Sequence, residues 1–356
     1  MYLRVTFALS MAASVVASLV FAGQGNDSAE RVGRKFHPGH YVALATSDDG
    51  PAAIRRALHP GVAGVQKRYT WRELEPREDE YDFTLITADL QVLEEEGAQL
   101  VVFVVDKSFR DERMTPEYLW ARYTLPIRSR KPGKGYVAKR WDPFVVTRMN
   151  KLLLEVGKQF DAHPRFEGIA LQESALGVDT SILDSEGYSA EAYRDALIEM
   201  LRTARVALPE SQVFWYMNYL ARGQQLLQSV SAAAARDGIV LGGPDALPDS
   251  DKLEKHVYPL LHRQRDSTLL FTSAQNDSFR HKRKRSSGGR EYWSPLEIFE
   301  FSRDELGVQY LFWNDVRRPR PEKSYGIADA YPVMAAYPRF NEVPNASEAG
   351  AIALPR

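Results

Sequence analysis

The chain has 356 residues, of which 44% are hydrophobic and 26% charged, and its formal net charge is -1. This composition is typical of a soluble globular protein, and the near balance of charge argues against a chain built to bind nucleic acid or a membrane surface. Because cysteine is absent, disulfides, thiol catalysis and lipid attachment to a cysteine are excluded.

The N-terminus has the pattern of an export signal. Arg4 supplies a short basic region, residues 5–22 are apolar or small, and Val20-Phe21-Ala22 fits a small-x-small cleavage site. We therefore expect a signal peptide at 1–22, a polar leader at 23–38, and a secreted or periplasmic protein with no stable membrane insertion after cleavage. An uncleaved anchor is the alternative, because about 18 apolar residues nearly span a bilayer.

From residue 39 onward, short apolar runs alternate with amphipathic stretches. The apolar runs predict eight β-strands: Tyr41–Ala45, Gly64–Tyr69, Leu100–Val105, Gly168–Leu171, Val213–Met217, Ile239–Leu241, Leu269–Thr272 and Gln309–Trp313. Apolar residues at three- and four-residue spacing predict helices between them: Leu85–Glu96, Val145–Phe160, Ala190–Ala207 and Gly223–Arg236. Asp142-Pro143, before the second of these, is typical of a helix start.

Eight strand–helix units favour an α/β fold, a closed (β/α)8 TIM barrel. We place it in a single domain at residues 39–345, followed by a C-terminal tail at 346–356. Continuous apolar strands are expected in a parallel sheet that helices cover. The open doubly wound sheet is the alternative, but no glycine-rich phosphate loop follows the first predicted strand.

The fourth predicted strand ends in an ionisable residue. The stretch FEGIALQESALG, Phe166 to Gly177, runs from an apolar strand into Gln172-Glu173. In a (β/α)8 barrel the active site lies at the C-terminal ends of the strands, so Glu173 is expected to enter the barrel mouth. A carboxylate there is suited to proton transfer. A structural role, in which Glu173 caps a helix or pairs with an arginine, is the alternative.

A distinctive motif follows the second predicted strand. After Arg68 the chain reads W-x-x-L-E-P-x-x-x-x-Y-D-F, with these positions at Trp71, Leu74, Glu75, Pro76, Tyr81, Asp82 and Phe83. A helical stretch and a strand containing G-x-x-L-V-V come next. This region, residues 65–104, resembles the second-strand region of clan-A glycoside hydrolases, the superfamily that holds many cellulases and β-galactosidases. The resemblance implies a barrel that acts on carbohydrate and needs no cofactor.

Carried over by position, the resemblance implies roles for several residues. Glu173 matches the acid/base of strand four. Gln172, where the family usually has asparagine, is expected to offer its amide to a sugar hydroxyl or to Glu173. Arg68 matches an arginine near the reacting centre. Trp313 matches an aromatic residue that stacks on a sugar ring, and Tyr216 matches a tyrosine near the nucleophile.

The seventh predicted strand departs from this family. Clan-A enzymes carry their nucleophilic glutamate there, whereas this chain has Gln275, and an amide cannot form a glycosyl ester. Asp277 and Asp245 are the other candidate carboxylates. Glycoside hydrolysis needs two carboxylates, about 5 Å apart for a covalent intermediate and roughly 6.5–9.5 Å apart when a water fits between them.

Three interpretations therefore stay open. One of the two aspartates completes a catalytic pair with Glu173, which makes the protein a glycoside hydrolase. Glu173 works alone in another reaction, and a uronate-polymer lyase with Tyr216 as the base is one form of this. The third interpretation is a barrel that binds polysaccharide without catalysis.

The long loops after the third and seventh strands are rich in basic residues. These are Lys107, Arg110, Arg113, Arg128, Arg130, Lys131, Lys134, Lys139 and Arg140 in the first loop, and Arg280, His281, Lys282, Arg283, Lys284, Arg285 and Arg290 in the second. Strand-end loops of a barrel converge on one face. Because arginine binds carboxylates and sulfates, the loops indicate an acidic polysaccharide. Nucleic acid is the competing polyanion and is not expected for an exported barrel.

Further candidates for substrate contacts lie at or near the ends of predicted strands: Lys107, Asn218, Gln275 and Asn314. Trp141, just before the helix that begins at Asp142-Pro143, is another candidate to line the cleft. The seven histidines show neither H-x-x-x-H nor H-E-x-x-H spacing, so no metal site is predicted. The sequence does not indicate the sugar, the linkage or the oligomeric state.

Overall fold

The computed structural model describes residues 33–44, 50–128, 135–283, 292–317, 319, 321 and 324–339. The predicted signal peptide at 1–22, the first part of the leader and the predicted tail at 346–356 lie outside these ranges. Within them the chain forms a closed barrel of eight parallel strands, which confirms the predicted (β/α)8 fold.

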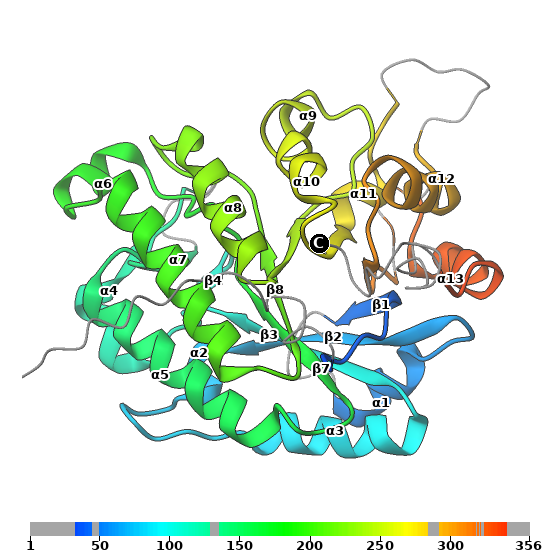
Figure 1. Ribbon diagram of the computed structural model, residues 1–356, viewed down its shortest axis with the longest axis horizontal. Helices are drawn as coiled ribbons and strands as arrows, with labels where there is room; N and C mark the ends of the chain where they lie inside the picture. Colours follow the sequence, from blue (N-terminus) through cyan, green and yellow to red (C-terminus); the bar gives the residue numbers. More distant parts are fainter. Residues whose placement is uncertain are drawn as a thin grey trace, which may run out of the picture. The chain divides into compact units, whose positions relative to one another are not determined.

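The barrel strands lie at the centre of the fold with helices around them (Figure 1). Each overlaps the strand predicted at the same place. They are β1 Gly39–Leu44, β2 Val62–Thr70, β3 Gln99–Val105, β7 Phe166–Leu171, β8 Gln212–Tyr216, β9 Val240–Gly243, β10 Leu270–Ala274 and β11 Tyr310–Asn314. They pair in this order around the barrel, and β11 pairs back with β1.

Helices follow the strands and cover the outside of the barrel (Figure 1). The longer ones are α1 Gly50–Ala57, α3 Thr84–Glu96, α5 Pro143–Phe160, α6 Thr180–Ser185, α7 Ala190–Ala207, α8 Leu227–Arg236, α9 Asp251–His256, α10 Tyr258–Gln264, α12 Pro295–Glu300 and α13 Ile327–Ala336. The short ones are α2 Trp71–Leu74, α4 Trp120–Tyr123 and α11 Asn276–Phe279. In the described part of the chain, no helix has the length and apolar character needed to span a bilayer.

Local signals in the sequence explain where the two longest helices begin. The Asp142 carboxylate accepts a hydrogen bond from the N–H of Phe144 at 2.9 Å, and Pro143 occupies the first position of α5, as predicted. The Ser189 hydroxyl caps α7 by accepting from the N–H of Ala192 at 3.0 Å. The two helices pack side by side and form the wall behind β7.

The barrel interior holds its own apolar cluster. Side chains alternate along a strand, so those of each strand divide between the outer core and the interior. Val65 and Tyr69 of β2 join the outer core, which leaves Gln66 and Arg68 pointing inward. The interior cluster consists mainly of Tyr41, Val101, Phe103, Phe214, Tyr216, Phe271, Tyr310 and Phe312. It closes the barrel below the mouth.

The W-x-x-L-E-P motif forms a buried hydrogen-bonded unit after β2. Thr70 caps α2 by accepting from the N–H of Glu73 at 3.1 Å. Glu75 is completely buried and accepts from the indole N–H of Trp71 at 2.7 Å and from the guanidinium of Arg148 on α5. The motif therefore ties the end of β2 to α5, which is a structural role.

Residues 33–38, the end of the predicted leader, lie against the N-terminal ends of the strands, away from the mouth. Lys35 donates to the carbonyl of Phe166 at 3.1 Å. The ring of His37 contacts the buried Glu167 carboxylate at 2.6 Å, and the Tyr310 hydroxyl donates to the same carboxylate at 2.6 Å. The hydrogen bond with Glu167 raises the pKa of His37. This segment is therefore anchored to the barrel.

The long loop after β3 contains a small antiparallel sheet. Its strands are β4 Lys107–Ser108, β5 Thr124–Pro126 and β6 Tyr136–Ala138, in the order β4-β6-β5. Pairing with β6 fixes β4 directly beyond the C-terminal end of β3. The sheet thus holds Lys107 at the mouth of the barrel.

Candidate active site

Glu173 lies just beyond the C-terminal end of β7, with 15% of its side chain exposed. Both carboxylate oxygens accept hydrogen bonds: Lys107 Nζ contacts Oε1 at 2.8 Å, and Asn218 Nδ2 contacts Oε2 at 2.5 Å. An ionised carboxylate only accepts hydrogen bonds, so two donors suit the ionised form of Glu173. The structure thus brings together three residues that the sequence predicted for the site.

Lys107 is the buried partner in this ion pair. Only 1% of its side chain is exposed, and Nζ also donates to the carbonyl of Ala175 at 2.7 Å. Burial lowers the pKa of Lys107, and the charge of Glu173 opposes that effect. An ammonium group buried without a partner is costly. The ion pair with Glu173 offsets this cost for Lys107.

A second buried ion pair braces the first. Arg140 and Asp106 form a bidentate pair, with Nε to Oδ2 at 2.7 Å and Nη2 to Oδ1 at 2.6 Å. Arg140 also donates to the backbone carbonyl of Glu173 at 2.5 Å. Because Asp106 directly precedes Lys107, this pair fixes the backbone on both sides of the contact between Lys107 and Glu173.

Asn218 is fixed by the strand ends around it. Its N–H donates to the hydroxyl of Ser174 at 2.9 Å, and the N–H of Ser174 donates to the carbonyl of Tyr216 at 3.2 Å. These bonds join the chain after β7 to the chain after β8. They aim the Asn218 amide at Glu173.

Asp245 is the second carboxylate of the mouth. It lies just beyond β9 and is partly buried, and the Tyr258 hydroxyl donates to its backbone carbonyl at 3.1 Å. Burial raises the pKa of Asp245 from 3.8 to about 7, with further contributions from the charges of Asp277 and Glu173. The charge of Glu173 therefore acts on Asp245 across the mouth, and Asp245 holds its proton to a higher pH than an ordinary aspartate.

Asp277 and Gln275, after β10, are placed differently. Asp277 lies on α11 with 63% of its side chain exposed, and Arg280 Nε donates to it at 2.8 Å. Gln275 occupies the cap position of α11, and its N–H donates to the hydroxyl of Ser278 at 3.1 Å. Of the two candidate aspartates, Asp245 is the one held in the mouth.

Arg68 and Asn314 also reach the mouth, and both are partly exposed. The guanidinium of Arg68 lies 5.7 Å from the centre of the Phe103 ring. Tyr216 lies below them, with its hydroxyl 3.0 Å from both Gln66 Oε1 and Ser273 Oγ. Burial raises the pKa of Tyr216 to about 12. Tyr216 is therefore part of the barrel interior and a poor base.

The described residues contain no group of three or more His, Asp and Glu side chains placed to hold a metal ion. The charged groups described above at the mouth are the carboxylates of Glu173 and Asp245, the ammonium of Lys107 and the guanidinium of Arg68. Two carboxylates in contrasting environments are suited to general acid–base chemistry.

Comparison with known proteins places this site in a known fold. No known family model and no curated protein matches the chain. Solved structures do match. A GH5_18 protein from Streptomyces cattleya, in complex with GlcNAc, matches with a TM-score of 0.57 and 15% identity, over 85% of this chain and 80% of its own.

Two further solved structures match to a similar degree. Endo-glycoceramidase II from Rhodococcus sp. matches with a TM-score of 0.52 and 13% identity, over 83% of this chain and 77% of its own. β-Galactosidase from Bacillus circulans sp. alkalophilus matches with a TM-score of 0.56 and 12% identity, over 86% of this chain and 56% of its own. The chain has the fold of the clan-A glycoside hydrolases.

Two residues that the sequence predicted to contact substrate, Trp313 and Trp141, are buried in this structure. Trp313 is completely buried on the outer side of β11, where its indole N–H donates to His40 Nδ1 at 3.0 Å and its ring packs near Phe279. No face of Trp313 is open to a sugar. Trp141 is buried as well, edge-on to Tyr188, and belongs to the outer core.

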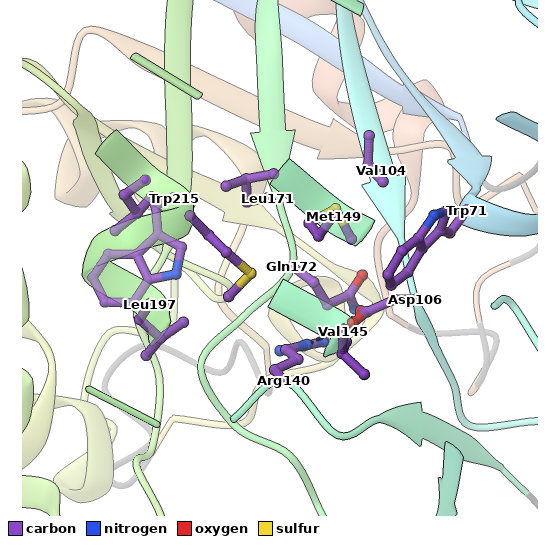
Figure 2. Close-up of a pocket in the computed structure, with 12 residues that line it drawn as sticks. Trp71, Val104, Asp106, Arg140, Val145, Met149, Leu171, Gln172, Leu197 and Trp215 are labelled. Atoms are coloured by element: carbon purple, nitrogen blue, oxygen red, sulfur yellow. Dashed lines mark hydrogen bonds and ion pairs between the residues drawn. The ribbon is translucent and has the colours of Figure 1, made fainter. Parts of the chain in front are cut away.

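Gln172 also departs from its expected role in this fold. It lines a small cavity of about 30 Å³ between β7 and the wall formed by α5 and α7. Figure 2 shows Gln172 close to Asp106 and Arg140, with Trp71 and Trp215 at opposite sides of the cavity. Gln172 Oε1 and Trp215 Nε1 are buried without a hydrogen-bond partner. Gln172 thus belongs to the support behind Glu173.

Many of the basic loop residues are neutralised within the fold. Salt bridges join Lys139 to Glu186, Arg140 to Asp106, Arg128 to Asp179, Arg280 to Asp277 and Arg283 to Glu297. Arg130, Lys131, Lys134, Lys284, Arg285 and Arg290 lie outside the described residues. Fewer of the loop residues therefore offer an unpaired positive charge at the mouth than the sequence suggests.

Phe109 is a site residue that the sequence analysis missed. Its ring is 65% exposed, directly after β4, and Lys107 Nζ lies 4.6 Å from the ring centre. An exposed aromatic ring beside the Glu173 ion pair is suited to stack on a sugar. In the sequence, only the position of Phe109 soon after a predicted strand could have indicated that it lies near the mouth.

Proposed function

We propose that the protein is a glycoside hydrolase that uses Glu173 and Asp245 as its catalytic pair. The observation that carries this proposal is the sharing of one mouth by two carboxylates in contrasting environments. Glu173 accepts hydrogen bonds from Lys107 and Asn218, whereas Asp245 is partly buried with its pKa raised to about 7. Pairs of groups whose environments separate their protonation states are the usual acid and base of such reactions.

The environments favour a particular division of roles. Asp245 holds a proton near neutral pH and would donate it to the glycosidic oxygen. Glu173 would face the positive charge that develops at the anomeric carbon, as the nucleophile or as the base for a water. This reverses the acid role that the resemblance implies for Glu173, because Lys107 and Asn218 donate to both of its carboxylate oxygens.

Neighbouring residues would orient the pair and the substrate. Lys107 and Asn218 hold both oxygens of Glu173. Asn314, at the end of β11, offers an amide to sugar hydroxyls, and Phe109 offers an exposed ring. These roles supply the positioning that glycosidic cleavage requires.

A polysaccharide-binding barrel without catalysis is the second candidate. Gln275, in place of a carboxylate after β10, favours it, as does the exposure of Asp277. The lyase interpretation is weaker, because the hydroxyl of Tyr216 is buried and hydrogen-bonded.

The substrate and the location of the protein belong to the same proposal. The matched structures include proteins named as a glycoceramidase and a β-galactosidase, which supports a carbohydrate substrate. Among the basic residues after β3, the exposed Arg110 supports an acidic polysaccharide, because it forms no ion pair in the described part of the chain. The apolar segment at residues 5–22 favours export, and N-terminal sequencing of the protein recovered from outside the cytoplasm would test cleavage after Ala22.

A reducing-end assay on a mixed glycan panel tests the proposed reaction. Wild type should release reducing ends. The rate of release should fall about 100-fold or more in Glu173→Gln and in Asp245→Asn, while both variants still bind the glycan. Asp277→Asn is the matched control and should keep most of the activity. Binding without any release would establish the non-catalytic barrel, and a product absorbing in the near ultraviolet would identify a lyase.

A further inference from the structure

Arg68 forms no ion pair with a carboxylate of the described residues. It points from β2 into the barrel and packs 5.7 Å from the centre of the Phe103 ring, with part of its surface open to the mouth. Glu173, whose charge acts on it, is already bound by Lys107 and Asn218. A partly buried guanidinium without an anionic partner is costly, so its position calls for a ligand.

Arg110 adds a second positive charge at the same place. It is exposed just beyond β4, and no acid in the described residues forms an ion pair with it. Burial is the main cause that lowers the pKa of Arg68, and the charge of Arg110 acts in the same direction. Two cations held near each other repel, and a neutral sugar would not offset this repulsion.

We infer that Arg68 and Arg110 form a subsite for an oxyanion, a carboxylate or a sulfate ester, carried by the sugar that binds beside Glu173. The inference rests on the proposed function, because it takes the barrel mouth as the place where the sugar binds. Guanidinium groups match both oxyanions with paired N–H donors. The acidic group would occupy the side of the mouth between β2 and β4, where Lys107 is already satisfied by Glu173.

Binding measured without turnover tests this subsite. In the Asp245→Asn background, which blocks turnover and keeps the ion pair between Lys107 and Glu173, calorimetry would compare uronate oligosaccharides, sulfated oligosaccharides and neutral oligosaccharides of equal length. The acidic probes should bind more tightly than the neutral ones, and the tighter acidic class identifies the group. Adding Arg68→Met should weaken binding of that class by about tenfold or more and leave neutral binding unchanged. The same variant should raise the denaturation midpoint, because it removes a poorly compensated charge.

The control and the contrary outcomes separate this inference from the proposed reaction. Arg202→Gln removes one positive charge from the exposed face of α7 and should change no affinity. Equal binding of acidic and neutral probes, no binding of any acidic probe, or an unchanged acidic affinity in Arg68→Met would overturn the subsite. Hydrolysis of neutral glycans alone would leave the proposed reaction standing. Acidic binding through Arg68 with no hydrolysis by wild type would leave the subsite standing without the reaction.

Discussion

Asp245→Asn should make the protein more stable at alkaline pH. The folded-state pKa of Asp245 is raised from 3.8 to about 7, mainly by burial and then by the charges of Asp277 and Glu173. A group whose pKa rises on folding contributes stability below its unfolded pKa and loses it as the pH passes the folded pKa. A shift of about three units corresponds to about 4 kcal/mol at most, of which roughly 2.7 kcal/mol is lost between pH 5 and pH 8.

Urea denaturation of wild type and Asp245→Asn at both pH values measures this loss. The free energy of unfolding of the variant, relative to wild type, should rise by about 2–3 kcal/mol from pH 5 to pH 8, because asparagine does not ionise. Asp277→Asn should show a much smaller change, since that side chain is exposed. A constant difference between wild type and Asp245→Asn at the two pH values would refute the reasoning and remove Asp245 as the proton donor.

Three other changes give distinct results. Asp106→Ala should lower the free energy of unfolding by about 3–5 kcal/mol in urea denaturation, because Arg140 would be left buried without its carboxylate; a loss below about 1 kcal/mol would show that the pair does not brace the site. Asp277→Asn should move the alkaline limb of the pH–rate profile to lower pH, because a negative neighbour that raises the pKa of Asp245 is removed; an unmoved limb would contradict that coupling. Phe109→Ala should raise KM by about three- to tenfold with little change in kcat in steady-state kinetics, as expected for lost stacking; a fall in kcat alone would contradict it.

The fold and the place of the site could be predicted from the sequence. The barrel strands are buried on both faces, so they read as continuous apolar runs, as Gln99–Val105 illustrates. The position of Glu173 followed from the end of such a run. Lys107 and Asn218 were recognised as strand-end residues, although nothing in the sequence showed that both contact Glu173.

The directions of side chains at the strand ends could not be predicted. Trp313 and Gln172 lie next to residues of the mouth, but a shift of one position along a strand turns a side chain to the opposite face. Contacts between distant segments were hidden as well. The sequence showed Arg140 only as one of several basic residues in a loop, whereas in the structure it pairs with Asp106, 34 positions away.

The leaving-group dependence of Asp245→Asn tests the catalytic pair most directly. On the natural linkage identified by the panel, this variant should lose about 100- to 10,000-fold in kcat/KM. On the same sugar with a dinitrophenyl leaving group, which departs without a proton, it should stay within about tenfold of wild type, whereas Glu173→Gln should be slow on both. Equal losses by Asp245→Asn on the two substrates, or no loss on either, would contradict the assignment of the pair.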